Sequence, residues 1–310
     1  MTTTTTAPSD HAPSDHAPHR APAHTRLLSV LLRYAIPLLA LLAAGPIAYT
    51  LSSGLASPTG GPDTSFLLSG SMGGGLKALL ISLALAAVFA AAGAVLLGAK
   101  GGLICAGYVL GWAAWGTGDV TMALRGTVDL SAMTLIVLSV EGLLFAVACV
   151  AMLILTAKLD RHHSAPLREV SARSFAKELV SIGALLPVLA AAAAAIVVAA
   201  LVAQSGLKGQ TLFAAMVAGI AASIAAHSAS TSESPHPYAP FIGVALAAVV
   251  APLIAIGYPG VGELPKGVVS GNLLGFARVS PADWAVALLI GVPVGLGWTG
   301  TLLPRHEIPA

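Results

Sequence analysis

The chain has 310 residues, of which 56% are hydrophobic and only 9% are charged, and its formal net charge at pH 7 is +2. A soluble domain carries about 25% charged residues, so this chain lacks the polar surface that a water-soluble globule needs. The composition excludes a cytosolic enzyme and indicates a membrane protein whose main partner is the lipid bilayer. The small net charge gives no reason to expect a nucleic-acid partner.

Residues 1–26 differ in composition from the rest of the chain. They contain a run of five threonines and two consecutive copies of Ala-Pro-Ser-Asp-His, at 7–11 and 12–16. Such a segment has too little apolar surface to offset the entropy that ordering costs. We expect a disordered cytoplasmic tail rich in Thr, Pro and His, and we expect its histidines to be solvated rather than to form a metal site.

Residues 27–303 form a series of apolar runs separated by short polar breaks. A helix needs about 20 apolar residues to cross about 30 Å of hydrocarbon. The sequence therefore predicts an all-α integral membrane bundle of about eight transmembrane helices, followed by a short tail at 304–310. The spans are expected near 27–51, 76–98, 101–118, 131–156, 179–203, 212–229, 241–258 and 284–303. The run at 101–118 is the shortest, and a re-entrant hairpin is its alternative.

The orientation of the bundle follows from the basic loop 157–178, which carries five Lys and Arg residues. Such clusters lie on the cytoplasmic side of a membrane. With eight spans, 9 Lys and Arg fall inside and 4 outside, Arg33 and Lys77 at helix ends being set aside. We expect both termini in the cytoplasm and the protein in the inner (plasma) membrane. The basic loop is also a candidate contact for anionic lipid or a cytoplasmic protein.

Small residues recur at helical spacing in three of the predicted spans. Helices in lipid associate largely through close approach at such positions, so the sequence predicts packing faces there. These positions are Ala214, Ala218, Ala222 and Ala226 in the sixth span, Gly107 and Gly111 in the third, and Gly291 and Gly295 in the eighth. The alternative is that an alanine- and glycine-rich composition produces the spacing.

Several prolines fall inside the predicted spans. Each removes a backbone hydrogen bond, so we expect kinks where neighbouring groups do not compensate. These residues are Pro37, Pro46, Pro187, Pro252 and Pro293.

Glu141 lies near the middle of the fourth predicted span. An ionisable group there costs about 2.5–3.5 kcal/mol or more, and such a group faces the interior of a bundle. One interpretation is a carboxylate that couples transport to a proton or a cation. The other is an interhelical hydrogen bond that fixes the packing.

His227 is a second polar candidate, because it follows Ser223 by four residues and so faces another helix near the cytoplasmic boundary. It is either a ligand or proton relay, or a side chain that reaches the membrane interface. No Cys and His spacing of the zinc type is present in the chain, so no metal is expected.

Asp119 ends the sequence Gly116-Thr117-Gly118-Asp119. This segment resembles the Gly-x-Gly-Asp motif of intramembrane aspartyl proteases, including the prepilin peptidases. The resemblance implies a second aspartate that shares a proton with Asp119 and helps to activate water. Asp63 is the residue available for that role. The alternative is a turn at a helix end.

We expect a multi-pass protein without a soluble catalytic domain. The leading hypothesis is a transporter-like protein for a small solute or an ion, with Glu141 as the coupling residue. The second is a non-catalytic assembly or scaffold subunit, and the third is the aspartyl peptidase, the only enzyme considered. No cofactor is expected, because the Gly-x-Gly-x-x-Gly match at 295–300 lies inside a predicted span without a preceding strand. The substrate and the oligomeric state stay open.

Overall fold

The computed structural model of the chain describes residues 31, 33–127, 130–160, 175–176, 181–230, 236–257, 264–270 and 273–302. Within these ranges all regular structure is helical. Seven helices are long and apolar enough to cross a membrane. The predicted class, a polytopic helical membrane protein, is confirmed at this level.

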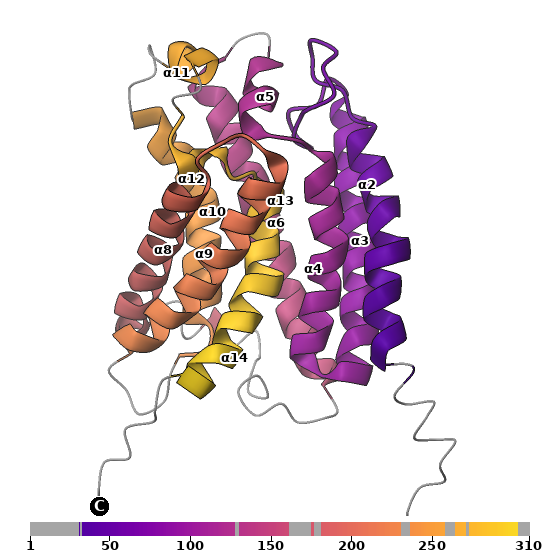
Figure 1. The fold of residues 1–310 in the computed structure, drawn as a ribbon, viewed down its shortest axis with the longest axis vertical. Helices are drawn as coiled ribbons and strands as arrows, with labels where there is room; N and C mark the ends of the chain where they lie inside the picture. Colours follow the sequence, from indigo (N-terminus) through magenta and orange to yellow (C-terminus); the bar gives the residue numbers. More distant parts are fainter. Residues whose placement is uncertain are drawn as a thin grey trace, which may run out of the picture.

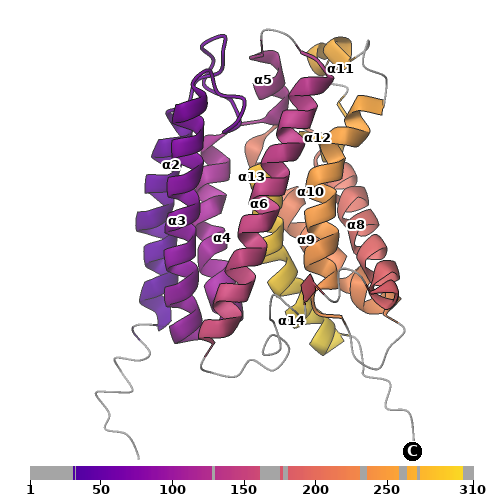
Figure 2. The same ribbon diagram turned by 180° about the vertical axis from the view of Figure 1, so that it is seen from behind.

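The long helices run side by side and form one bundle (Figures 1 and 2). The first spanning helix covers Arg33–Ser53 and includes a π-helical turn. The elements are η1 (Ala40–Ala44), α2 (Gly45–Ser53), α3 (Met72–Leu97), α4 (Ala99–Gly116), α5 (Val120–Arg125), α6 (Ala132–Leu159), α8 (Ile182–Val202), α9 (Lys208–Ala229), α10 (Ala239–Gly257), α11 (Leu264–Ser270), α12 (Gly275–Arg278), α13 (Pro281–Val286), η4 (Ala287–Gly291) and α14 (Val292–Leu302).

Helix α4 is not among the seven helices that are long and apolar enough to span. It is nevertheless one continuous helix of 18 residues, which at 1.5 Å per residue extends about 27 Å. It lies alongside α3 in Figure 1 and packs against α2, α3 and α13. The re-entrant hairpin is therefore wrong for this segment, because the chain does not reverse within it.

The two ends of the bundle differ. The start of the indigo first helix and the end of the yellow α14 lie at one end (Figure 1). Loop 54–71 and the short helices α5, α11 and α12 lie at the opposite end, which we call the loop end. Both tails and most of the basic loop 157–178 lie outside the described residues, so the predictions for them stay predictions.

Two of the five intrahelical prolines directly follow a π-helical segment. Pro46 comes just after η1 and Pro293 just after η4. A proline ring clashes with the carbonyl four residues earlier, and a wider π turn relieves that clash. Pro187 and Pro252 instead lie within α8 and α10, which continue through them. At Pro46 and Pro293, where the sequence predicted kinks, the helix thus contains a π turn.

Helix α9 crosses the last spanning helix through glycines. A Cβ atom on Gly291 would lie 2.4 Å from the carbonyl oxygen of Met216, and one on Gly219 would lie 2.5 Å from that of Ala287. Nearby, the hydroxyl of Ser223 donates to the carbonyl of Val292 at 3.1 Å. Close backbone approach thus holds the two helices together.

The remaining small residues of the predicted packing faces lie as follows. Ala214, Ala218, Ala222 and Ala226 are all buried in α9, which also packs against α8 and α10. A Cβ on Gly295 would lie 2.9 Å from the Cα of Ile220, and one on Gly107 would lie 2.3 Å from Cγ1 of Ile290. Gly111 differs, because a Cβ there would meet only Cγ2 of Val286, at 3.9 Å. Space for a side chain therefore exists at Gly111.

The helix formed by α13, η4 and α14 is central to the bundle. Its span is the most buried of the seven, and it packs against α4, α6, α9 and α10. It begins with Ser280 as N-cap, Pro281 in the first turn and a capping box between Ser280 and Asp283. This start agrees with the residue pattern of a helix N-terminus.

Candidate functional site

Glu141 on α6 is fully buried. Its Oε2 atom accepts a hydrogen bond from the backbone N–H of Leu67 at 2.8 Å. Its Oε1 atom has no hydrogen-bond partner within the described ranges. The partner of Oε2 is thus the backbone of a loop.

Loop 54–71 reaches Glu141 because its central residues insert among the helices. Thr64, Ser65 and Phe66 are buried. The ring of Phe66 lies 5.9 Å from that of Phe145, one helical turn beyond Glu141. The N–H of Thr64 also donates to the carbonyl of Thr117 at the end of α4, at 3.1 Å. The loop is therefore held by α4 on one side and by α6 on the other.

A buried ion pair joins α9 to α13 close to this loop. Lys208 Nζ lies 2.8 Å from Asp283 Oδ1 and donates to Oδ2 at 3.0 Å. It also donates to the Ser280 hydroxyl at 3.1 Å. The Asp283 side chain is fully buried and that of Lys208 is 10% exposed. Removing one partner of such a pair leaves an uncompensated buried charge, so the pair fixes the two helix starts to each other.

Lys208 also acts on two further carboxylates. It lies within electrostatic range of Glu141 and of Asp119. The nearly buried Lys208 ammonium thus contacts Asp283 directly and interacts with Glu141 and Asp119 at longer range. We call these four residues the Lys208 cluster.

Asp119 lies at the loop end, between α4 and α5, and outside the spanning helices. It is the N-cap of α5, and its Oδ1 accepts the N–H of Thr121 at 3.0 Å. A Cβ on Gly206 would lie 2.3 Å from its Oδ2, so the α8–α9 loop packs on this carboxylate. Burial raises the pKa of Asp119 above its ordinary value, against the opposing effects of the Thr121 hydrogen bond and of Lys208 and Arg278.

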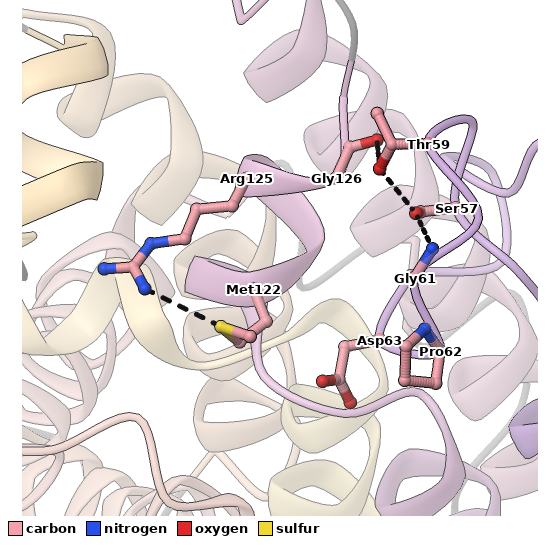
Figure 3. Close-up of a pocket in the computed structure, with 8 residues that line it drawn as sticks. All are labelled: Ser57, Thr59, Gly61, Pro62, Asp63, Met122, Arg125 and Gly126. Atoms are coloured by element: carbon pink, nitrogen blue, oxygen red, sulfur yellow. Dashed lines mark hydrogen bonds between the residues drawn. The ribbon is translucent and has the colours of Figure 1, made fainter.

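Asp63 lines a pocket of about 200 Å³ at the loop end, together with Met122 and Arg125 (Figure 3). Its carboxylate lies against Gly118, whose φ of +70° is one that glycine adopts without strain. The Arg125 guanidinium extends away from Asp63 (Figure 3) and donates to the carbonyls of Val268 and Val269.

The Asp63 carboxylate thus lies against the residue that precedes Asp119 in the chain. The shared proton that the Gly-x-Gly-Asp resemblance implies stays a prediction.

His227 is half-buried in the last turn of α9. Because Lys208 begins this helix, His227 lies at its other end, about 28 Å away along the axis. The structure thus does not bring His227 together with the Lys208 cluster. Among the residues that the structure describes, no group of three or more His, Cys, Asp or Glu side chains is arranged to hold a metal ion.

Sequence reasoning missed the Lys208–Asp283 pair. The available signal was that both begin neighbouring spans on the same predicted side with opposite charges. Nothing in the sequence indicated that the N–H of Leu67 would donate to Glu141, because every residue except proline carries a backbone N–H.

Searches of protein families, of curated proteins and of solved structures find no match to this chain.

Proposed function

We propose that this protein is a carrier for a small solute or an ion, and that Glu141 takes up and releases a proton or a cation during transport. The observation that carries the proposal is Glu141 Oε1, a fully buried carboxylate oxygen without a partner in the described structure. Buried polar atoms are nearly always satisfied, so an unsatisfied one needs an explanation. Carboxylates at membrane depth commonly mark ion and proton pathways.

The Lys208 cluster supplies a physical route from ion uptake to helix movement. Neutralising Glu141 changes the field at Lys208, which lies within its electrostatic range. Lys208 in turn holds α9 to α13 through Asp283. The chain enters the π-helical turn η4 four residues beyond Asp283, and π turns are common at functional sites. A change of charge at Glu141 is thereby linked to the most buried helix.

We further propose that the chain crosses the inner (plasma) membrane eight times, with α4 as the third crossing and both termini in the cytoplasm. The start of the first helix and the end of α14 at the same end of the bundle support an even number of crossings (Figure 1). The excess of Lys and Arg in loop 157–178 supports placing that end inside.

An assembly or scaffold subunit is the second candidate. The hydrogen bond from Leu67 favours it, because this bond gives Glu141 a purely structural task. In that case the interior stays dry, and the basic loop 157–178 contacts a cytoplasmic partner or anionic lipid.

A membrane-permeant carbodiimide separates the two candidates, because it reacts with protonated carboxyl groups and not with ionised ones. Two fully buried carboxylates provide an internal comparison. Asp283 is in direct contact with Lys208, whereas Glu141 has an oxygen without a partner among the described residues. We expect a carbodiimide adduct on the peptide that contains Glu141, none on the peptide that contains Asp283, and none at position 141 in E141Q. Absence of a Glu141 adduct at every pH, with an adduct on the SDS-unfolded protein as reagent control, would contradict the carrier and favour the scaffold.

A further inference from the structure

An apolar cavity of about 560 Å³ lies between helix α4 and three spanning helices, away from the Glu141 carboxylate. Helix α4 contributes Tyr108, Trp112 and Trp115, which are four and three residues apart and so share one face. Helix α9 contributes Leu212 and Met216, again four residues apart. We call this cavity the α4–α9 groove. Its volume lies within the range of small-molecule sites, which is about 300–1,000 Å³.

The third wall of the groove comes from the most buried helix. Val286 ends α13 and Ile290 lies in η4. Leu41, from the π-helical turn η1, closes the wall beside α4. Both π-helical turns thus border the same cavity. Gly107 and Gly111 also line it and leave it open because they have no side chains.

The groove opens on the outer side of the bundle, which faces lipid if these helices cross the membrane as proposed. All of its lining residues belong to spanning helices or to α4, and none belongs to a loop. Of its lining residues, Trp115 is 49% exposed at the rim. An empty apolar cavity loses the dispersion contacts that a close-packed interior has. Lipid chains are the apolar material that surrounds this rim.

A charged pair lies beyond one end of the groove. Lys208 lies one helical turn before Leu212, and Asp283 lies three residues before Val286, so their ion pair follows the groove at the loop end. The ring of Trp115 stands over Gly209 there, 3.5 Å from the position of a Cβ. Tryptophan with one apolar and one polar side is typical of membrane interfaces. The groove is thus lined by apolar and aromatic residues, and the ion pair lies beyond its loop end, in the order in which an amphiphilic lipid places its chain and its headgroup.

We propose that the α4–α9 groove binds one acyl chain of a membrane phospholipid, with the headgroup beside the Lys208–Asp283 pair. A helix of a second protein fits these observations less well, because the ion pair and the Trp115 ring close one end of the groove. The site goes beyond the proposed carrier function and does not depend on Glu141 exchanging an ion.

Gly111 offers a way to fill the groove. A side chain there meets only Val286, at 3.9 Å from the Cβ, so Gly111→Leu enters the cavity without a backbone clash. Gly297→Leu is the matched control, because no atom lies within 4 Å of a Cβ at that position and Gly297 does not line the groove. Leu212→Trp fills the groove from the opposite wall and serves if Gly111→Leu does not fold.

The test uses the full chain in vesicles of phosphatidylethanolamine that carries a photoreactive diazirine on one acyl chain. We expect adducts on peptides covering 107–115 and 212–216, with a several-fold loss in Gly111→Leu or Leu212→Trp and no loss in Gly297→Leu. Equal labelling of these peptides in all variants would overturn the proposal. Crosslinks between two copies of the chain at this face, in place of lipid adducts, would overturn it as well.

Discussion

The backbone N–H of Leu67 donates to Glu141 Oε2 across 2.8 Å and joins a loop to a spanning helix 74 positions later in the chain. The same carboxylate keeps its other oxygen unpartnered within the described structure. Glu141 therefore has one oxygen in a structural contact and one oxygen that, in the proposed carrier, would exchange a proton or a cation. Substitution can separate the contact from the proposed exchange.

Glu141→Gln retains an oxygen that accepts the Leu67 N–H, whereas Glu141→Leu leaves that N–H without a partner. An unsatisfied buried donor costs about 1–3 kcal/mol. We expect E141L to unfold at a clearly lower temperature than E141Q in the same detergent. Thermal unfolding followed by tryptophan fluorescence measures the difference. Equal midpoints for the two variants would show that the loop does not depend on this hydrogen bond.

Substitutions of Lys208 and Asp283 are expected to have strongly non-additive effects on the free energy of unfolding. Lys208→Met leaves Asp283 as a buried unpaired charge, and Asp283→Asn does the same to Lys208; breaking a buried pair costs about 3–5 kcal/mol. Asparagine still caps the helix start, and the double variant contains neither charge. We therefore expect the double variant to be less destabilised than the sum of the single variants. A double-mutant cycle on unfolding free energies tests this, and simple additivity would argue against direct coupling.

The crossing of α9 and the last spanning helix predicts that Gly291→Ala is destabilising. The added Cβ would lie 2.4 Å from the Met216 carbonyl, so the helices must move apart. Forcing extra atoms into a packed contact costs about 1–3 kcal/mol. Gly297→Ala, with open space around the Cβ, is expected to leave thermal stability nearly unchanged. Similar midpoints for both variants would contradict this description of the crossing.

Asp119 predicts a pH dependence of stability at the loop end. Burial raises its pKa in the folded protein, so the folded state holds this proton more tightly than the unfolded state does. Its favourable contribution is therefore complete below about pH 4, the ordinary pKa of aspartate, and is lost as the pH rises through the folded value. Asp119→Asn keeps the N-cap but cannot titrate. We expect the unfolding midpoint of the wild type to fall more steeply than that of D119N as the pH increases from 4. Parallel curves of unfolding midpoint against pH for the wild type and D119N would show that folding does not shift the pKa of Asp119.

The sequence predicted a spanning helix well wherever the apolar run of that one segment was sufficient evidence. The apolar runs of α6 and α8 are long enough to identify a span without tertiary information. Helix α4 was the uncertain case, because Lys100 and its glycines lower its apolar content. Its burial against neighbouring helices makes this composition tolerable, and that burial is visible only in three dimensions.

The site was predictable only in part. Glu141 stands out because a lone carboxylate in an apolar run has a known cost. The Lys208–Asp283 contact joins residues 75 positions apart, and no local pattern specifies such a pair. Gly291 was predicted to lie on a packing face. That it meets Gly219 depends on how the helices are arranged.

Water access to the Glu141 region tests the central claim most directly. In the structure Glu141 is fully buried, and Ser65, two residues before Leu67 in the loop that contacts it, is 4% exposed. A carrier must open this region to one side of the membrane at some stage, whereas a scaffold need not. Cysteine is introduced at 141 or at 65 after replacing Cys105 and Cys149 by serine. The position 65 variant leaves the Glu141 carboxylate in place.

The measurement is the labelling of these cysteines by a membrane-impermeant maleimide, added from each side in turn. Leu153→Cys, fully buried three turns further along α6, is the matched control, and Thr59→Cys at the exposed loop end shows that the reagent is active. We predict labelling at positions 65 and 141 from one side, and none at 153. Failure of both positions to react from either side, while position 59 reacts, would contradict the carrier and leave Glu141 as the residue that holds loop 54–71 in place.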